Sequence, residues 1–407
     1  MPRLRVSVPL WLERGSRPRG VRFPLLSRDC EVDIAVVGGG ITGAAVAWRF
    51  ADAGLTVAVV EGARIGRGST AASTAMLMQE PDEDFERLAR RYGPRRAKRI
   101  WQLSQQATRE FVRVLKRLHI PCDLERRDSV YYALTEDDAR RLRSEHRGRT
   151  AAGLGGRWLD RRGVRRALGF QAAAAIRTSG NAQVDPYKAC VGLMHAAADA
   201  GALIFERSPI DAIGRSQKGV VLETARGRIR ADRVVIATGY ATPYFKPLEA
   251  RFRMLNTYVV ATRPVTAAER RRIGLGAVMH WDTGRPYHYA RWTPDHRLML
   301  GGGDRRLVPE RQRVQALREA SRGVHEHFLG LYPALADVPL QYEWEGLFAT
   351  TPDGLPYIGP HRRYPRHLFA LGYGGNGMTF GFLASRLLLD WYRGDRSDDH
   401  QLFAFTR

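Results

Sequence analysis

The feature that most constrains the fold is a strand–turn–helix–strand pattern near the start of the chain, over residues 32–61. Residues 32–37 form a short apolar run, which is typical of a strand buried on both faces. The glycine-rich turn 38–43 follows at once and opens an Ala-rich helix. A second apolar strand, 55–60, then ends at Glu61. A βαβ unit with the spacing GxGxxG at its first turn predicts a parallel, Rossmann-like α/β sheet.

Each glycine of the turn has a physical role that suits a bound dinucleotide. Gly38 permits the tight turn, Gly40 lets the backbone approach a pyrophosphate, and Gly43 lets the helix pack closely on the strand. The start of the helix offers N–H groups and partial positive charge to phosphate. Glu61 can accept hydrogen bonds from ribose hydroxyls; the alternative is a strand–helix turn without a ligand. The expected contacts of this unit are Gly38, Gly40, Ile41, Thr42, Gly43, Glu61 and Gly62.

A second block of small and hydroxylated residues, 64–75, directly follows the acidic tip. Its Gly, Ser and Thr groups could line an extended phosphate and ribityl chain, which would favour FAD over NAD. An ordinary exposed loop is the alternative. The expected contacts are Arg67, Gly68, Ser69, Thr70, Ser73 and Thr74.

Helical and strand periodicities alternate through the rest of the chain. A capping box at Thr135 and Asp138 predicts a helix start, and Asp185-Pro186 predicts another that ends at Gly201. A strand over 233–237 runs into the small-residue turn Ala237, Thr238 and Gly239, which suits close packing against a cofactor. Further helices are expected over 99–118, 310–329 and 379–392, and further strands over 128–134, 203–206, 220–224, 254–263, 280–282, 287–293, 297–302 and 368–371.

Length and composition exclude several classes of protein. With 407 residues, 44% of them hydrophobic, the chain can bury two sizeable cores. No apolar run approaches the roughly 18–20 residues that a membrane-spanning helix needs. Three distant cysteines exclude a disulfide framework, and neither HExxH nor a Cys/His cluster indicates a metal. We therefore expect a cytoplasmic protein with no signal peptide, no membrane span and no metal site.

The formal charge of +23 raises the question of a nucleic-acid partner. Only five of the 65 basic residues are Lys, so Arg carries the excess. The dense basic runs 87–99 and 140–149 have helical periodicity, and such charged faces are usually solvated. No nucleic-acid-binding motif accompanies them. We expect no nucleic-acid partner; a basic surface for RNA or anionic membranes is the alternative.

Together these blocks resemble the D-amino-acid oxidase/glycine oxidase-like superfamily of FAD-dependent oxidoreductases. The resemblance is carried by residues 33–61, 66–75, 183–186, 233–239, 351–359 and 371–377, in the order that the superfamily shows. It implies a Rossmann-like FAD-binding domain, interleaved with an α+β substrate domain built on a mixed sheet. The implied FAD-binding segments are 30–84, 180–245 and 342–407, the substrate segments are 85–179 and 246–341, and 1–29 would be an arm packed on the surface.

The resemblance also implies how FAD is held. The C-terminal glycine-rich turn and its helix would approach the flavin ring, whose reduced form carries negative charge that a helix N-terminus stabilises. Relatives that bind FAD covalently use a Cys at the position of Gly346 or a His just after the Glu-tipped strand, and residues 61–75 contain no His. We therefore expect non-covalent FAD. The implied contacts in this turn are Gly374, Gly375, Asn376, Gly377, Met378 and Thr379.

For such a superfamily member, the implied reaction is oxidation of the C–N bond of an amine or amino acid, by hydride transfer to flavin N5 and hydrolysis of the resulting imine. Arg291 is the candidate for pairing with a substrate carboxylate, and Tyr289 and Tyr258 are candidates for orienting the substrate. Structural pairing on a sheet face is the alternative for all three; His280, His288 and Tyr373 are further candidates facing the flavin. Oxygen or a respiratory carrier would accept the electrons. Other readings are oxidation of a 2-hydroxy acid or glycerol-phosphate, and a flavin-bearing, RNA-associated protein.

Overall fold

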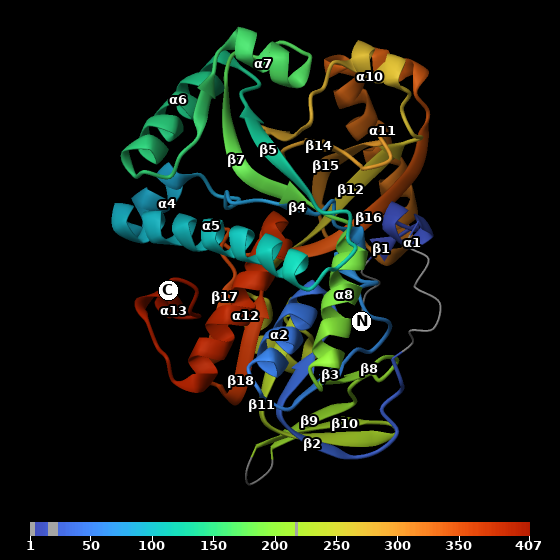
Figure 1. Cartoon of the computed structure of the whole chain (residues 1–407), viewed down its shortest axis with the longest axis vertical. Coiled ribbons are helices and arrows are strands. Elements are labelled where there is room, and N and C mark those ends of the chain that lie inside the picture. The colour runs from blue at the N-terminus through green and yellow to red at the C-terminus, as the bar shows by residue number, and fades with distance from the viewer. Residues whose placement is uncertain (1–4, 15–22, 216–218) are drawn as a thin grey trace.

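The computed structural model describes residues 5–14, 23–215 and 219–407 and contains two large sheets, drawn in the lower and upper halves of Figure 1. The lower sheet has eight strands and the upper sheet has ten. The chain crosses between them several times, so each sheet is built from segments that are far apart in the sequence.

The eight-stranded sheet is built around the βαβ unit that the sequence predicts. Its central strand is β2 (Cys30–Val37), which pairs in parallel with β3 (Val57–Val60) on one side and β11 (Gly227–Gly239) on the other. β3 is buried throughout and about half of the residues of β2 and β11 are buried, which explains their apolar runs. The remaining strands are β8 (Leu203–Phe205), β9 (Ala212–Arg215), β10 (Val220–Thr224), β17 (Tyr357–His361) and β18 (Tyr364–Leu371).

Helices cover this sheet and carry the chain between its strands (Figure 1). The helix of the βαβ unit, α2 (Ile41–Asp52), packs between α8 (Pro186–Asp199) and α12 (Gly377–Arg393). α5 (Pro94–Arg117) packs against α12 on the side facing the upper sheet. The short elements of this half are α3 (Ser69–Ala72), η1 (Pro243–Phe245), α9 (Lys246–Glu249), η4 (Gly374–Asn376) and α13 (Asp398–Gln401).

The ten-stranded sheet is largely antiparallel, as predicted for the middle of the chain, although β5 and β13 pair in parallel. Its strands are β1 (Arg5–Val6), β4 (Met76–Leu77), β5 (Glu125–Tyr132), β6 (Arg157–Leu159), β7 (Ala175–Gln183), β12 (Arg253–Thr262), β13 (Val278–Asp282), β14 (Tyr289–Trp292), β15 (Leu298–Arg306) and β16 (Leu340–Thr350). Its helices are α4 (Phe85–Tyr92), α6 (Glu136–Ala151), α7 (Arg161–Leu168), α10 (Ala267–Ile273), α11 (Arg313–Leu331), η2 (Glu310–Gln312) and η3 (Pro333–Asp337).

The described part of the N-terminal segment is not an arm on the surface, because it pairs with the larger sheet and buries two of its side chains. β1 pairs with β16 of the larger sheet, and in α1 (Leu10–Arg14) the side chains of Leu10 and Trp11 are buried. Residues 15–22 lie outside the described part of the chain. Strand pairing also places β16 entirely in the larger sheet, although a boundary at residue 342 would assign most of it to the cofactor-binding segments.

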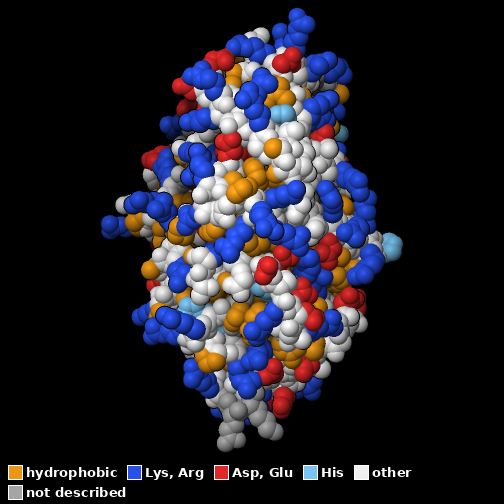
Figure 2. All heavy atoms as spheres, turned by 90° about the vertical axis from the view of Figure 1, so that its left-hand side faces the viewer, with side chains coloured by type: hydrophobic (Ala, Val, Ile, Leu, Met, Phe, Trp, Pro, Cys, Tyr) orange, Lys and Arg blue, Asp and Glu red, His pale blue; other side chains and the backbone are white. Residues whose placement is uncertain are grey.

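Basic side chains spread over the face shown in Figure 2 from one end to the other, with acidic and apolar side chains between them. Several basic side chains pair with carboxylates, such as Arg99 in α5 with Asp399 and Arg263, just after β12, with Glu269, both at 2.6 Å. Among the residues described, no helix combines the length and the apolar character needed to cross a membrane.

Candidate cofactor and substrate site

A cavity of about 1590 Å³ lies at the junction of the two sheets. The smaller sheet contributes the carboxyl ends of β2, β3 and β11, where parallel α/β sheets bind their ligands. The larger sheet contributes residues of β5, β13, β14, β15 and β16. The cavity brings together predicted residues from five separate segments: Gly38, Gly40, Ile41, Thr42, Glu61, Gly62, Arg67, Gly68, Ser69, Thr70, Ser73, Thr74, Ala237, Thr238, Gly239, Gly374, Gly375, Asn376, Gly377 and Met378.

The glycine-rich turn has the geometry that a closely approaching ligand requires. Gly38 has φ +106°, and a Cβ there would lie 2.8 Å from the carbonyl oxygen of Ala237. Gly43 does not line the cavity; a Cβ there would overlap the carbonyl oxygen of Gly38. Gly43 therefore has the packing role that the sequence assigned to it. Gly40 is the N-cap of α2 and provides no capping side chain, so the helix start faces the cavity without one.

Glu61 lies where the ribose of an ADP moiety is expected. Its Oε2 accepts a hydrogen bond from the backbone N of Gly39 at 2.7 Å, and its Oε1 accepts one from the N of Ala63 at 2.7 Å. Burial raises the pKa of this carboxyl group, while the two N–H donors oppose that effect. The two bonds hold Glu61 against the turn, at the wall of the cavity.

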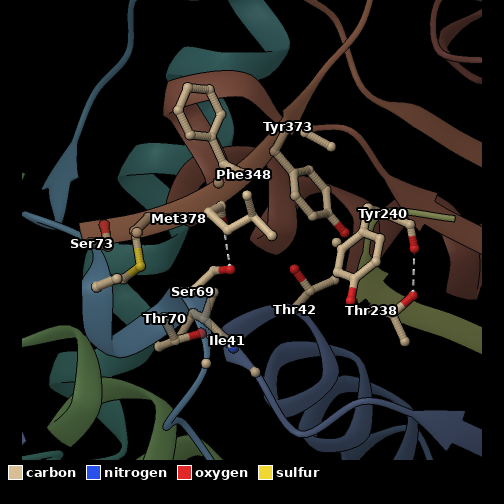
Figure 3. Close-up of a pocket in the computed structure, with 18 of the residues that line it drawn as sticks. Ile41, Thr42, Ser69, Thr70, Ser73, Thr238, Tyr240, Phe348, Tyr373 and Met378 are labelled. Carbon is tan, nitrogen blue, oxygen red and sulfur yellow. Dashed lines mark hydrogen bonds between the residues drawn. The ribbon is translucent and has the colours of Figure 1, made fainter. Parts of the chain in front are cut away.

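The hydroxylated block folds around the start of α2. Thr70 Oγ1 accepts a hydrogen bond from the N of Ile41 at 3.0 Å, and Ser69 Oγ donates one to the carbonyl of Leu347 at 2.7 Å. In Figure 3 the hydroxyls of Thr42 and Ser69 point toward the same space. Trp11 Nε1 donates to the carbonyl of Ser73 at 2.9 Å, so the N-terminal segment braces this block from outside.

The C-terminal turn closes the opposite wall. Gly374 has φ +58°, and the N of Gly375 donates a hydrogen bond to Asp82 Oδ2 at 2.6 Å. Asn376 Nδ2 donates to the carbonyl of Glu80 at 2.7 Å. Thr379 does not line the cavity, because its hydroxyl turns away to the carbonyl of Met78 at 2.9 Å.

These residues fit FAD. The cavity exceeds the roughly 300–1,000 Å³ of ordinary ligand pockets, as an extended dinucleotide requires. Its lining includes an acidic group, a glycine turn at a helix start, a row of hydroxyls and a second helix start, which suit the ribose, the pyrophosphate, the ribityl chain and the flavin ring of FAD.

Beyond the C-terminal turn the cavity has aromatic and charged walls, most of which the sequence did not single out. Of the predicted substrate residues, Tyr289 lies here. The residues missed include Glu80, Asp82, Asp84, Tyr131, Arg149, Trp281, Arg285, Tyr287, Asp304 and Phe348. One signal was visible: the acidic run 80–84 begins five residues after the end of the hydroxylated block.

Arg291 does not line the cavity, so its predicted pairing with a substrate carboxylate is wrong for this structure. The side chain is 1% exposed, Nη2 donates to the carbonyl of Val184 at 2.9 Å, and the guanidinium lies 5.1 Å from the ring centre of Trp11. Burial lowers the pKa of Arg291 to about 9. Arg291 is two residues from Tyr289 in β14, but the N-terminal segment covers it.

Tyr258 is also absent from the cavity wall. Its neighbour Thr257 lines the cavity, and because side chains alternate along β12, Tyr258 packs on the other face, against α11. His280 is buried beside Tyr332, with its Nε2 3.1 Å from the hydroxyl, and burial lowers the pKa of His280 to about 3. Tyr373, in contrast, lines the cavity.

One cluster could be mistaken for a metal centre. Asp282, His288 and His327 bring possible ligand atoms within 4.8 Å of one another. The two imidazole rings stack with centres 3.8 Å apart and planes 12° apart, so their in-plane lone pairs run nearly parallel and do not converge on one ion. Asp282 Oδ2 lies 3.3 Å from His288 Nδ1 and 3.5 Å from His327 Nε2, so the carboxylate contacts both rings.

A family model for FAD-dependent oxidoreductases (DAO) matches residues 33–391. The chain belongs to this family. Among its relatives, the gamma-glutamylputrescine oxidoreductase of Escherichia coli strain K12 is 27% identical over 382 residues, which are 92% of this chain and 86% of the relative. The glycine oxidase of Bacillus licheniformis is 26% identical over 392 residues, which are 92% of this chain and 96% of the relative.

The solved structure of the glycine oxidase from Geobacillus kaustophilus has the same fold, with a TM-score of 0.78 at 23% identity over 93% of this chain and 99% of that chain. The predicted α/β fold and the predicted family are therefore confirmed. The protein is an FAD-dependent oxidoreductase, and FAD is its cofactor.

Proposed function

We propose that this oxidoreductase oxidises the C–N bond of an amine or amino acid, giving an imine that water hydrolyses. When bound, FAD supplies the acceptor for a hydride from the carbon beside the nitrogen. The observation that carries the proposal is the composition of the cavity beyond the C-terminal turn, where Asp82, Asp84 and Asp304 face a space walled by aromatic rings. Carboxylates and ring faces attract amino groups and repel phosphates, and a 2-hydroxy acid has no amino group to offset the repulsion of its carboxylate.

The chain's own residues position the substrate and exclude water. Burial raises the pKa of Tyr287 well above its ordinary value and also raises that of Tyr289, so both hydroxyls stay neutral hydrogen-bonding groups. The indole of Trp281 stacks on Tyr131, with ring centres 5.1 Å apart, and forms part of an apolar wall. An amine that arrives deprotonated needs no strong base here, so these residues only have to orient it.

The relatives support this substrate class by their names, since one acts on gamma-glutamylputrescine and another on glycine. Several further features belong to the same proposal: non-covalent FAD, oxygen or a respiratory carrier as electron acceptor, a cytoplasmic location, and no nucleic-acid partner. We also propose that the segments 30–84, 180–245 and 342–407 act as the FAD-binding unit, with β16 shared structurally with the substrate unit of 85–179 and 246–341.

Anaerobic mixing of the FAD-loaded protein with panels of amines, amino acids and 2-hydroxy acids tests the proposal. We expect an amine or amino acid to bleach the flavin absorbance, and the hydroxy acids to leave it unchanged. Bleaching by glycerol-phosphate or a hydroxy acid alone would replace the proposal with C–O oxidation. Salt-sensitive RNA binding without bleaching by any of these compounds would favour the RNA-associated alternative.

A further inference from the structure

The part of the cavity beyond the C-terminal turn contains two carboxylates that the rest of the fold leaves without a cation. Asp82 lies between β4 and α4, and Asp304 lies in β15, so they approach the cavity from different elements. Among the described residues, neither carboxylate has an Arg or Lys nitrogen within 4.0 Å. Glu80, in contrast, accepts hydrogen bonds from Ser129 at 2.7 Å and Asn181 at 3.0 Å, and needs no ligand.

Asp304 is the less satisfied of the pair. Its Oδ1 is buried, and within the described part of the chain it has no hydrogen-bond partner. Burial raises the pKa of Asp304 to about 6, although the hydroxyl of Thr257 and the nearby His288 oppose the shift. A buried carboxylate left in this state costs free energy unless a cation approaches it.

Asp82 is held at the C-terminal turn but is not neutralised there. Burial raises the pKa of Asp82 to about 7, with smaller contributions from Glu83 and Asp304, while the N of Gly375, which donates to Asp82 at 2.6 Å, opposes the rise. Arg285 opposes this rise from a distance. A Cβ on Gly375 would lie 2.5 Å from the hydroxyl of Tyr287 and 3.1 Å from Asp82 Oδ1, so the tyrosine and the carboxylate flank the same glycine.

The surrounding groups suit an ammonium ion. The rings of Tyr287 and Tyr289, whose centres are 5.9 Å apart, both line the cavity. Two cations lie nearby, against the carboxylates Glu80, Asp82, Asp84 and Asp304 of the same lining. Arg149 Nε lies 2.6 Å from Glu145 Oε1, while its buried Nη1 has no hydrogen-bond partner among the described residues. Arg285 is drawn toward Tyr131, Asp84 and Glu83. The balance of charge at this end of the cavity therefore remains negative.

We infer that Asp304 and Asp82 form a subsite for a protonated amino group that is not oxidised, and that the substrate is a diamine or polyamine. This inference rests on the proposed function. The nitrogen that is oxidised must lose its proton before its neighbouring carbon can give up a hydride, and two unneutralised carboxylates would hold that proton in place. The group they hold is therefore a second ammonium ion of the same molecule.

Anaerobic reduction of the FAD-loaded protein by matched pairs of compounds tests the inference. The probes are 1,4-diaminobutane, its 3- and 5-carbon homologues, butylamine and glycine. The variants are Asp304→Asn and Asp82→Asn, with Asp304→Glu as the charge-conserving variant. Asp137→Asn is the matched control, because Asp137 is exposed on α6 and pairs with the exposed Arg140.

We expect a diamine to reduce the flavin at lower concentration than butylamine or glycine. Each Asn variant should raise the concentration needed for half-maximal reduction by the diamine about 10–100-fold, as expected for loss of a charged hydrogen bond. The rise for butylamine should be smaller, because butylamine lacks the second ammonium ion. Asp304→Glu should retain part of the preference, and Asp137→Asn should behave as wild type. The diamine should also raise the Tm of the FAD-loaded wild type but not that of Asp304→Asn.

Three results would overturn the inference. If butylamine or glycine reduces the flavin as readily as any diamine and the Asn variants change nothing, the subsite is wrong while C–N oxidation stands. If only hydroxy acids reduce the flavin, the subsite and the proposed function both fail. If no compound reduces the flavin and no diamine shifts the Tm, the missing Tm shift by itself rules out the cation subsite.

Discussion

Glu61 shows how a single carboxyl group can organise a cofactor site before the cofactor arrives. Its two oxygens are held by the N–H groups of Gly39 and Ala63, each at 2.7 Å, and this fixes the side chain at the cavity wall. The sequence predicted its position, because an acidic residue at the tip of the second strand is a local feature of the βαβ unit.

Replacing Glu61 should therefore weaken FAD binding more than it weakens the fold. We expect Glu61→Ala to raise the Kd for FAD about 10–100-fold, because bonds to the ribose and the support of the turn are both lost. Isothermal titration of apoprotein with FAD measures the change. Asp211→Asn, an exposed carboxylate outside the cavity lining, provides the control. An unchanged Kd in Glu61→Ala would show that the ADP end lies elsewhere.

We expect the carboxyl group of Asp82 to lower the stability of the folded protein when it is ionised, although it serves the substrate site. Its pKa of about 7 in the folded protein exceeds the value of about 3.9 for an unfolded Asp, so the folded state binds the proton more tightly. The contribution of this carboxyl group to stability must then fall as the pH rises from about 4 to about 7. Asp82→Asn removes the charge, so we expect its Tm to rise relative to wild type over the same window.

Thermal melts of both proteins at pH 5 and pH 8, without substrate, measure this difference. The gain in Asp82→Asn should be larger at pH 8, where wild-type Asp82 is ionised. Asp137→Asn should show no such growth with pH. A variant that loses stability equally at both pH values would show that Asp82 supports the fold as a partner of Gly375 and not as a charged ligand group.

At the scale of elements, the close contact between the glycine-rich turn and α2 has no room for a side chain. A methyl group on Gly43 would overlap the carbonyl oxygen of Gly38. We expect Gly43→Ala to lower the free energy of unfolding by about 1–3 kcal/mol and to reduce FAD binding. Gly323 in α11 has open space around it, so Gly323→Ala should be neutral or stabilise by up to about 1 kcal/mol. Urea unfolding measures the free energy of unfolding of both variants. Equal values would contradict the close packing of Gly43 against Gly38.

The N-terminal segment predicts a second effect at this scale. Trp11 is 1% exposed and donates a hydrogen bond to Ser73 in the hydroxylated block. We expect Trp11→Ala to speed the release of FAD, because this block loses its outer brace. Trp158→Ala, which alters the edge strand β6 outside the cavity lining, should leave the release rate unchanged. The appearance of free-flavin fluorescence on dilution measures the release rate of each variant. Identical rates for Trp11→Ala and Trp158→Ala would show that Trp11 does not brace this block.

Local sequence patterns predicted the positions of helices and strands better than they predicted which segments bury the side chains of those elements. The capping box at Thr135 and Asp138 is present, and α8 begins at Pro186 behind an Asp185 cap. β7 was missed because its Thr-Ser-Gly-Asn stretch has the composition of a turn, and pairing with β5 overrides that preference. Arg291 was misplaced because strand alternation gives a face but not the N-terminal segment that buries it.

At the scale of the whole molecule, the cofactor half of the cavity was predictable and the substrate half was not. The predicted FAD contacts that line the cavity lie in five short segments, each of which the sequence shows as a local pattern. Asp82, Tyr287 and Asp304 are separated by hundreds of residues or lie on different elements, and only the crossing of the chain between the two sheets brings them to one cavity. The net charge of +23 coexists with this acidic cavity, so the total charge says little about the ligand.

The central claim is that an amine loses a hydride from the carbon beside its nitrogen in this cavity. Stopped-flow reduction of the FAD-loaded protein by 1,4-diaminobutane, unlabelled and deuterated at the carbons beside nitrogen, tests it most directly. The account predicts that the diamine bleaches the flavin and that deuteration slows the bleaching. Bleaching at the same rate with both forms, or no bleaching by any amine while a hydroxy acid is effective, would contradict it.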